Sequence, residues 1–239
     1  MKMKFTLLII GFLFAGVLSS CNLPQKGQSE AKATQSPKTE EPTQQPILKN
    51  DQCGNQYYPV VNGAQWSYNG PTGPFTNTIS TGDNGTFTIT AQSEKHTFVI
   101  QGVCLDGGDI NILDVPGVSL DSSGDSGSSQ MTTTSNDGIT LPGDIQIGDD
   151  WSQTIGVNVV SGEQNMNFVI DSTYTAEGYE SVTVPAGTFF ALKINQSSNM
   201  GSGTPTEQTL WYVQGIGVVK TLIALDQPLS TELVSYNIP

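Results

Sequence analysis

Apolar and polar residues alternate along most of the chain from residue 51 onward. Residues 86–91 alternate threonine with apolar side chains, and residues 166–174 place Met, Phe, Ile and Tyr in phase. A period of two residues is typical of strands with one buried face, and no stretch repeats apolar residues at helical spacing over three turns. The same pattern predicts further strands at 65–69, 75–80, 97–104, 109–114, 151–160, 178–184, 188–197, 206–213, 216–225 and 229–237.

Turn signals separate these segments, including Asn-Gly, Pro-Gly, Gly-Asp and Ser-Gly pairs. Such turns join neighbouring strands in antiparallel pairs. Around a dozen strands are too many for a flat open sheet, which must curl, close or split. Residues 51–239 are therefore predicted to form one all-β domain, a large curved antiparallel sheet that is clam-like or a partly closed barrel.

The first 20 residues have the pattern of an export signal. Lys2 and Lys4 precede an apolar run of 14 residues, Phe5–Leu18, which is shorter than the roughly 20 residues that span a bilayer. The run ends in Leu-Ser-Ser-Cys21, which resembles the bacterial lipoprotein box. The resemblance implies that residues 1–20 are removed, and that Cys21 carries a thioether-linked diacylglycerol and an acylated amino group. A secreted protein with a chance cysteine is the alternative.

Residues 21–50 are expected to be the lipidated cysteine and a disordered tether. The segment from Asn22 to Asn50 consists mostly of Gln, Ser, Thr, Pro, Lys and Glu, which bury too little apolar surface to offset the entropy of ordering. A coil of this length spans on the order of 30 Å. The predicted organisation is thus a signal peptide, a tether and a single β-rich domain.

Charge is distributed unevenly along the chain. Six of the nine lysines and only three of the 22 acidic residues precede residue 51, so residues 51–239 carry a formal charge of about −16. The chain has no arginine, and a nucleic-acid partner is excluded because no basic footprint exists. The acidic field repels anionic headgroups, so the lipid on Cys21 is expected to be the membrane contact.

Two cysteines remain in the predicted domain, Cys53 and Cys104. An even pair in an exported domain indicates a disulfide, which closes a loop of about 50 residues and stabilises by roughly 4 kcal/mol in the chain-entropy model. A metal site is the alternative, and it would need both thiols, the single histidine His96 and a carboxylate. The sequence lacks the closely spaced cysteines that are typical of zinc sites.

Three motifs suggest a family. They are Gly63-x-x-Trp66-x-Tyr68, Val184-Pro-Ala-Gly-Thr-Phe189 and Trp211-Tyr-x-x-Gly-Ile-Gly-x-Val-Lys220. Their order and spacing resemble a group of uncharacterised bacterial envelope lipoproteins. That group is similar in turn to the clam-like sheets of periplasmic lipoprotein carriers and lipid-binding lipoproteins, by fold analogy. The resemblance implies a fold and a compartment but supplies no catalytic residue.

Candidate catalytic and metal-binding residues are few. His96 would have to serve any Ser-His-Asp relay, and no G-x-S-x-G motif is present. The pair Asp149-Asp150 beside Trp151 is the best candidate for a glycosidase-like acid pair, although adjacent strand residues point to opposite faces. The Asp-rich segments 106–109 and 121–125 contain oxygen ligands suited to calcium, but neither is a complete loop motif. We expect no cofactor, no metal and no catalytic residue.

The preferred hypothesis is a non-enzymatic lipoprotein of the cell membrane or outer membrane, with its domain outside the cytoplasm. The domain is expected to bind a lipid, an apolar small molecule or an envelope protein. Its expected ligand-lining residues are Phe168, Ile170, Phe190, Leu192, Trp211 and Val218. The same alternation is equally what a filled core needs. A structural or adhesive surface module, and a hydrolase using an Asp/Glu pair, are the alternatives.

Overall fold

The structure is a computed structural model that describes residues 50–113, 129–161, 163–201 and 204–239. Within these ranges, twelve strands form one antiparallel sheet, and the only helical element is a 3-10 turn at Asp106–Gly108. The strands are β1 (Gln65–Gly70), β2 (Gly73–Thr81), β3 (Thr86–Ser93), β4 (Thr97–Cys104), β5 (Ile110–Ile112), β6 (Ser129–Gly138), β7 (Asp150–Ser161), β8 (Gln164–Val184), β9 (Gly187–Met200), β10 (Thr206–Val213), β11 (Gly217–Ala224) and β12 (Leu229–Asn237). The predicted all-β class is confirmed.

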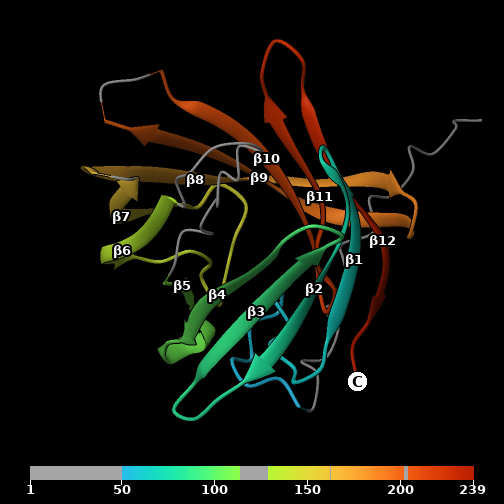
Figure 1. The fold of residues 1–239 in the computed structure, drawn as a ribbon. Coiled ribbons are helices and arrows are strands. Elements are labelled where there is room, and N and C mark those ends of the chain that lie inside the picture. The colour runs from blue at the N-terminus through green and yellow to red at the C-terminus, as the bar shows by residue number, and fades with distance from the viewer. Residues whose placement is uncertain (1–49, 114–128, 162, 202–203) are drawn as a thin grey trace, which may run out of the picture. The chain divides into compact units, whose positions relative to one another are not determined.

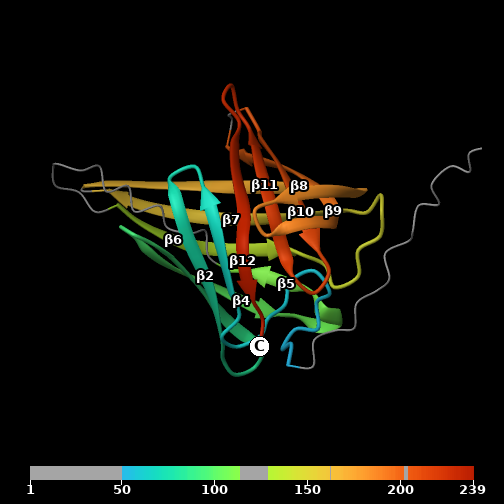
Figure 2. The same cartoon turned by 90° about the vertical axis from the view of Figure 1, so that its right-hand side faces the viewer.

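Sheet order follows chain order with one exception. The order is β5-β4-β3-β2-β1-β12-β11-β10-β9-β8-β7-β6, so the first and last strands are paired near its middle. Figures 1 and 2 show β8 and β9 running across the direction of β11 and β12, which means that the sheet turns strongly between them. The predicted curved sheet is confirmed, and it takes the form of a nearly closed barrel.

Strands β5 and β6 are the two edges of the sheet, and polar groups join them along a seam. Ile110 forms an isolated antiparallel bridge to Leu141. Asn136 Nδ2 donates to the Ile112 carbonyl at 2.7 Å, and Asn111 Nδ2 donates to the Gly138 carbonyl at 3.1 Å. These contacts use backbone groups that an open edge would leave unpaired.

The side chain of Gln153, from β7, crosses this seam. It is 3% exposed, and its Nε2 donates to Asn111 Oδ1 at 2.7 Å and to Asn136 Oδ1 at 3.0 Å. Its Oε1 accepts from the hydroxyl of Thr140 at 3.0 Å. Because buried amides are costly unless bonded, this set of side chains stabilises the sheet in its closed arrangement.

The strand pattern differs from the prediction in two places. The separate strands expected at 166–174 and 178–184 are one strand of 21 residues, β8, with a bulge between Ala176 and Gly178. Gly178 has φ 150°, a value that suits glycine and lets the chain bend without ending the strand. Strand β6 was not expected, because its Ser/Thr-rich sequence lacks an apolar alternation.

Residues 51–64 precede β1 and pack as an irregular segment against the sheet. Tyr57, Val60 and Val61 are almost fully buried, and the Gln56 carbonyl accepts from the Gly215 amide at 2.8 Å. The predicted disulfide between Cys53 and Cys104 is present, with Cα atoms 5.0 Å apart. It ties this segment to the end of β4.

Asp51 organises the start of the same segment. Its Oδ1 accepts from the backbone amides of Cys53, Gly54 and Val60 at 3.0–3.2 Å. Burial raises the pKa of this carboxyl above its usual value of 3.8, although the three amide hydrogen bonds act in the opposite direction. Ionisation of Asp51 is therefore less favourable in the folded protein than in water.

In the portion of the chain that the structure describes, no helix has the length and apolar character needed to cross a membrane.

Candidate functional site: an aromatic cavity in the sheet

A half-open cavity of about 270 Å³ lies between β1–β3 on one side and β11–β12 on the other. The segment before β1 contributes Tyr58 and Pro59. Most of the lining is aromatic or aliphatic, with an asparagine and two threonines. The lining residues are Tyr58, Pro59, Trp66, Tyr68, Phe75, Asn77, Ile79, Ile89, Gly217, Val218, Thr221 and Thr231. We call the face of the sheet that carries these residues the cavity face.

Strand alternation and three polar or stacking contacts fix the aromatic wall. Trp66 and Tyr68 share one face of β1, as the two-residue period requires. Trp66 Nε1 donates to the Ile216 carbonyl at 2.6 Å, and Tyr68 OH donates to the Val218 carbonyl at 2.8 Å. Phe75 stacks on Tyr68 with ring centroids 5.3 Å apart. The start of β11 is thereby held against β1.

Asn77 is a polar residue at an apolar position. It lies on β2 in phase with Phe75 and Ile79, and is paired with Trp66 on β1 and Ala91 on β3. Its Oδ1 is buried and has no hydrogen-bond partner among the described residues. A buried acceptor without a donor costs about 1–3 kcal/mol, so this side chain is unfavourable for packing alone.

Burial perturbs the tyrosines of this region. It raises the pKa of Tyr58, Tyr68 and Tyr212 well above the usual value of 10. Their hydroxyls consequently stay protonated at neutral pH and act as hydrogen-bonding groups rather than as bases. The lining residues include no carboxylate, histidine, lysine or cysteine.

The register gives the positions of the six residues predicted to line a ligand site. Of these, Val218 lines the cavity. Leu192 shares its face, because Leu192 and Val218 both pair with Tyr212. Phe190, two residues before Leu192, lies on the same face, stacks on Tyr179 at 5.4 Å and is 43% exposed.

Phe168 and Ile170 lie further along the cavity face, on β8. They are half-buried and pair with Val157 and Ile155 of β7. The structure thus brings five of the six residues to one face but only Val218 to the cavity. Their contact with a ligand stays a prediction.

Trp211 lies on the other face of the sheet, because it precedes Tyr212 on a regularly paired strand. Its Nε1 donates to Glu180 at 2.6 Å, and the Lys220 ammonium lies over its ring at 5.9 Å. Lys220 also forms an ion pair with Glu232 at 2.8 Å. The contacts of Trp211 are therefore those of a packed residue, which is 8% exposed.

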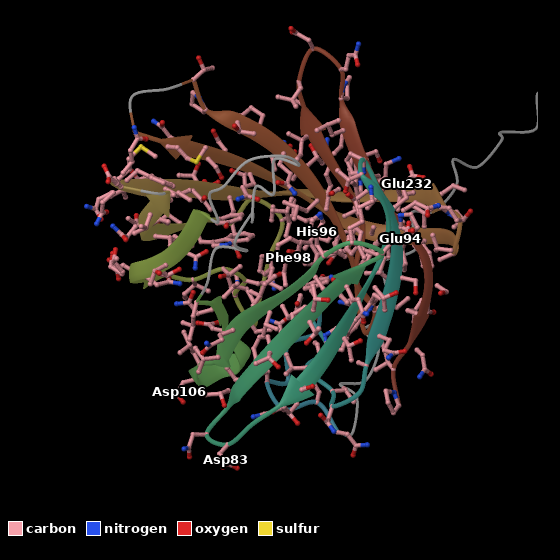
Figure 3. All side chains as sticks on the ribbon, viewed as in Figure 1. Asp83, Glu94, His96, Phe98, Asp106 and Glu232 are labelled. Carbon is pink, nitrogen blue, oxygen red and sulfur yellow. A yellow bond between two sulfur atoms is a disulfide. The ribbon has the colours of Figure 1, made fainter. Side chains whose placement is uncertain are left out.

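The candidate catalytic residues occupy turns and strand ends. Figure 3 shows His96 with Glu94 and Phe98 at one end of β3 and β4, far from Asp83 and Asp106 at the other end. Asp149 Oδ2 accepts from the Gln146 amide at 2.8 Å, and Asp150 Oδ1 accepts from the Thr175 hydroxyl at 2.5 Å. Each acid has a local structural partner.

Metal ligands are not gathered in the described ranges, where no group of three or more His, Cys, Asp or Glu side chains could hold an ion. In the segment 106–109, Asp109 Oδ1 accepts from the Gly143 amide at 2.8 Å. The segment 121–125, the leader 1–20 and Cys21 lie outside the described residues.

Apart from Val218, the sequence analysis did not identify the cavity residues as a site. Trp66 and Tyr68 belong to a motif that indicates a family resemblance but not a binding site. Asn77 did carry a signal, since it interrupts the alternation between Phe75 and Ile79. The pairing of β1 with β12, which brings the two walls together, leaves no local mark in the sequence.

Comparisons with known proteins agree with this fold. The DUF3108-like family model matches residues 103–222, and no curated protein matches the chain. Solved structures that resemble it include a candidate exported protein with a YmcC-like fold from Bacteroides fragilis. That protein is 14% identical, with a TM-score of 0.50 over 77% of this chain and 99% of the other.

Two further structures show weaker similarity. They are a candidate lipoprotein from Parabacteroides distasonis (15% identity, TM-score 0.46, 77% of this chain and 99% of that one) and the hypothetical lipoprotein YmcC from Escherichia coli (11%, 0.42, 77% and 87%). The family match and the Bacteroides fragilis structure together confirm a distant resemblance in fold.

Proposed function

The chain belongs to the DUF3108-like family, and from that premise we propose that it is an envelope lipoprotein that holds a small apolar molecule without transforming it. The observation that carries the proposal is the half-open aromatic cavity between β1–β3 and β11–β12. The leader and Cys21 support the location, as do the descriptions of similar proteins as exported or as lipoproteins.

Cavity size limits the ligand. Pockets for drug-sized molecules usually measure about 300–1,000 Å³, and this cavity of about 270 Å³ falls just below that range. A lipid with two acyl chains is too large to be enclosed. A ring system or the end of a single chain is the class of ligand that fits.

Cavity chemistry favours binding over catalysis. Aromatic and aliphatic walls gain free energy by excluding water from an apolar ligand. General acid–base catalysis needs a group that titrates near the working pH, whereas Tyr58 and Tyr68 have raised pKa values and the other lining side chains do not titrate.

Filling the cavity tests the proposal. The full chain carrying Cys21→Ser avoids acylation and detergent, and its binding of benzofuran is measured by NMR titration. Val218→Phe and Thr221→Leu each add bulk to the lining and should weaken binding at least tenfold. Val99→Phe is the matched control, because Val99 is 60% exposed on β4 and its substitution should leave binding unchanged.

Native mass spectrometry of the same protein, followed by solvent extraction, shows whether a cellular ligand accompanies it. Circular dichroism establishes that both filling variants keep the β-sheet. A folded protein that takes up no benzofuran, or filling variants that bind as tightly as the starting protein, would refute the binding proposal.

The anchor is tested separately by cell fractionation. Cys21→Ser should move the protein from the membrane fraction to the soluble fraction, since stable anchoring depends on the acyl chains. Cys53→Ser breaks the disulfide of the domain instead and should leave the protein in the membrane fraction. Membrane retention of the Cys21→Ser protein would contradict the proposed anchor.

A further inference from the structure

We propose that Asn77 Oδ1 is the recognition group of the cavity, and that it accepts a hydrogen bond from the single N–H or O–H of a small neutral ring compound. This inference rests on the binding proposal above and adds the chemistry of the ligand. It assigns the one polar side chain of β2 that faces the cavity.

The position of Asn77 carries the argument. The cavity face of β2 reads Phe75, Asn77, Ile79, and a third apolar residue at the middle position would continue the wall. Asn77 lines the cavity instead, and its Oδ1 is covered beside Trp66 with no donor among the described residues. Rotation about χ2, a torsion with only weak preferences in asparagine, exchanges the two ends of the amide and brings this oxygen to a ligand in the cavity. An orphaned acceptor in an apolar cavity selects a ligand that supplies a donor, because a ligand without one leaves the cost of burial in place.

Shape and charge define the rest of the ligand. The walls hold four aromatic rings, those of Tyr58, Trp66, Tyr68 and Phe75, and aromatic rings pack well against a flat partner. An anion is disfavoured, since the lining has no cation and residues 51–239 carry a formal charge of about −16. A primary ammonium ion is disfavoured because no carboxylate lines the cavity. A quaternary ammonium group is attracted by aromatic rings but has no donor for Asn77.

A matched pair of ligands tests the inference. Indole and benzofuran have nearly the same shape, but only indole has an N–H donor. With the full chain carrying Cys21→Ser, NMR titration should give an affinity for indole about three- to tenfold higher than for benzofuran, the range expected for one hydrogen bond. Asn77→Leu should abolish this preference while it retains the affinity for benzofuran within about twofold.

Asn199→Leu is the control variant. Asn199 Oδ1 is also buried without a partner among the described residues, but it lies on β9 and does not line the cavity. Its substitution should leave the preference for indole unchanged. Asn77→Leu should in addition raise the melting temperature of the ligand-free protein, which shows that the variant folds.

The outcomes separate the two proposals. Absence of binding for both compounds refutes the binding function. Equal affinity for indole and benzofuran in the protein that retains Asn77 refutes the recognition role but not the binding function. A preference for indole that persists in Asn77→Leu does the same. Loss of the preference in Asn77→Leu but not in Asn199→Leu supports it.

Discussion

Replacement of Gln153 by methionine should open the seam of the sheet. The substitution keeps the side-chain volume but removes the donors to Asn111 and Asn136 and the acceptor for Thr140. Thr140 can still donate to Asn111 Oδ1, at 3.3 Å. Asn136 Oδ1 has no second donor among the described hydrogen bonds, so it is left unsatisfied.

The magnitude follows from these contacts. Asn136 Oδ1, left without a donor, costs about 1–3 kcal/mol. The oxygens of Asn111 and Ile112 keep Thr140 and Asn136 as donors, so loss of their bonds to Gln153 together contributes about 1 kcal/mol. The free energy of unfolding should therefore fall by about 2–4 kcal/mol. At roughly 2–4 °C per kcal/mol for a domain of this size, the melting temperature should fall by about 4–16 °C.

Urea unfolding followed by tryptophan fluorescence measures the change. Hydrogen exchange locates it, because the amides of Ile110 and Leu141 bond across the seam and should lose protection before those of β8 and β9. Gln196→Met is the control, since Gln196 is only half-buried and bonds to Ser198 away from the seam. A Gln153→Met protein within 0.5 kcal/mol of the original would refute the role assigned to this network.

Three further substitutions test other parts of the fold. Asp51→Asn keeps an oxygen acceptor for the backbone amides but cannot ionise. Because the pKa of Asp51 is raised in the folded protein, the original protein loses stability as the pH rises through that pKa. Thermal melts should therefore show the melting temperature of the variant rising, relative to that of the original protein, from pH 4 to pH 7. Cys53→Ser combined with Cys104→Ser should lower the free energy of unfolding by about 2–5 kcal/mol, and unchanged urea midpoints would exclude a stabilising disulfide. Gly102→Ala should cost about 1–3 kcal/mol because its Cβ would overlap the ring of Phe87, and an unaffected midpoint would show that the ring moves aside freely.

Local pattern was enough to predict the strands whose side chains alternate. Residues 86–91 and 97–104 became β3 and β4 because one face of each is buried. The Ser/Thr-rich β6 could not be recognised, since its strand conformation depends on pairing with β7 rather than on burial of its own side chains. The continuity of β8 was missed because Gly178 resembles a turn residue and acts as a bulge.

The site was less accessible to sequence reasoning than the fold. Alternation shows which residues of one strand share a face. It does not show which face of a neighbouring strand lies on the same side of the sheet. Trp211 and Leu192 were grouped for this reason, although the register places them on opposite faces. The cavity walls come from strands about 150 residues apart, joined by bonds such as Trp66 to Ile216.

The pairing of β1 with β12 also governs when the sheet can be completed. Gln65 lies opposite Asn237, so a chain that emerges N-terminus first, from a ribosome or an export channel, lacks the partner of its first strand until its last strand appears. Such distant pairing is slow to form, and until then one edge of β1 is free to join other chains. The sheet can therefore be completed only after the whole chain has emerged. Before that point, a chaperone that binds unfolded chains would give the greatest protection against aggregation.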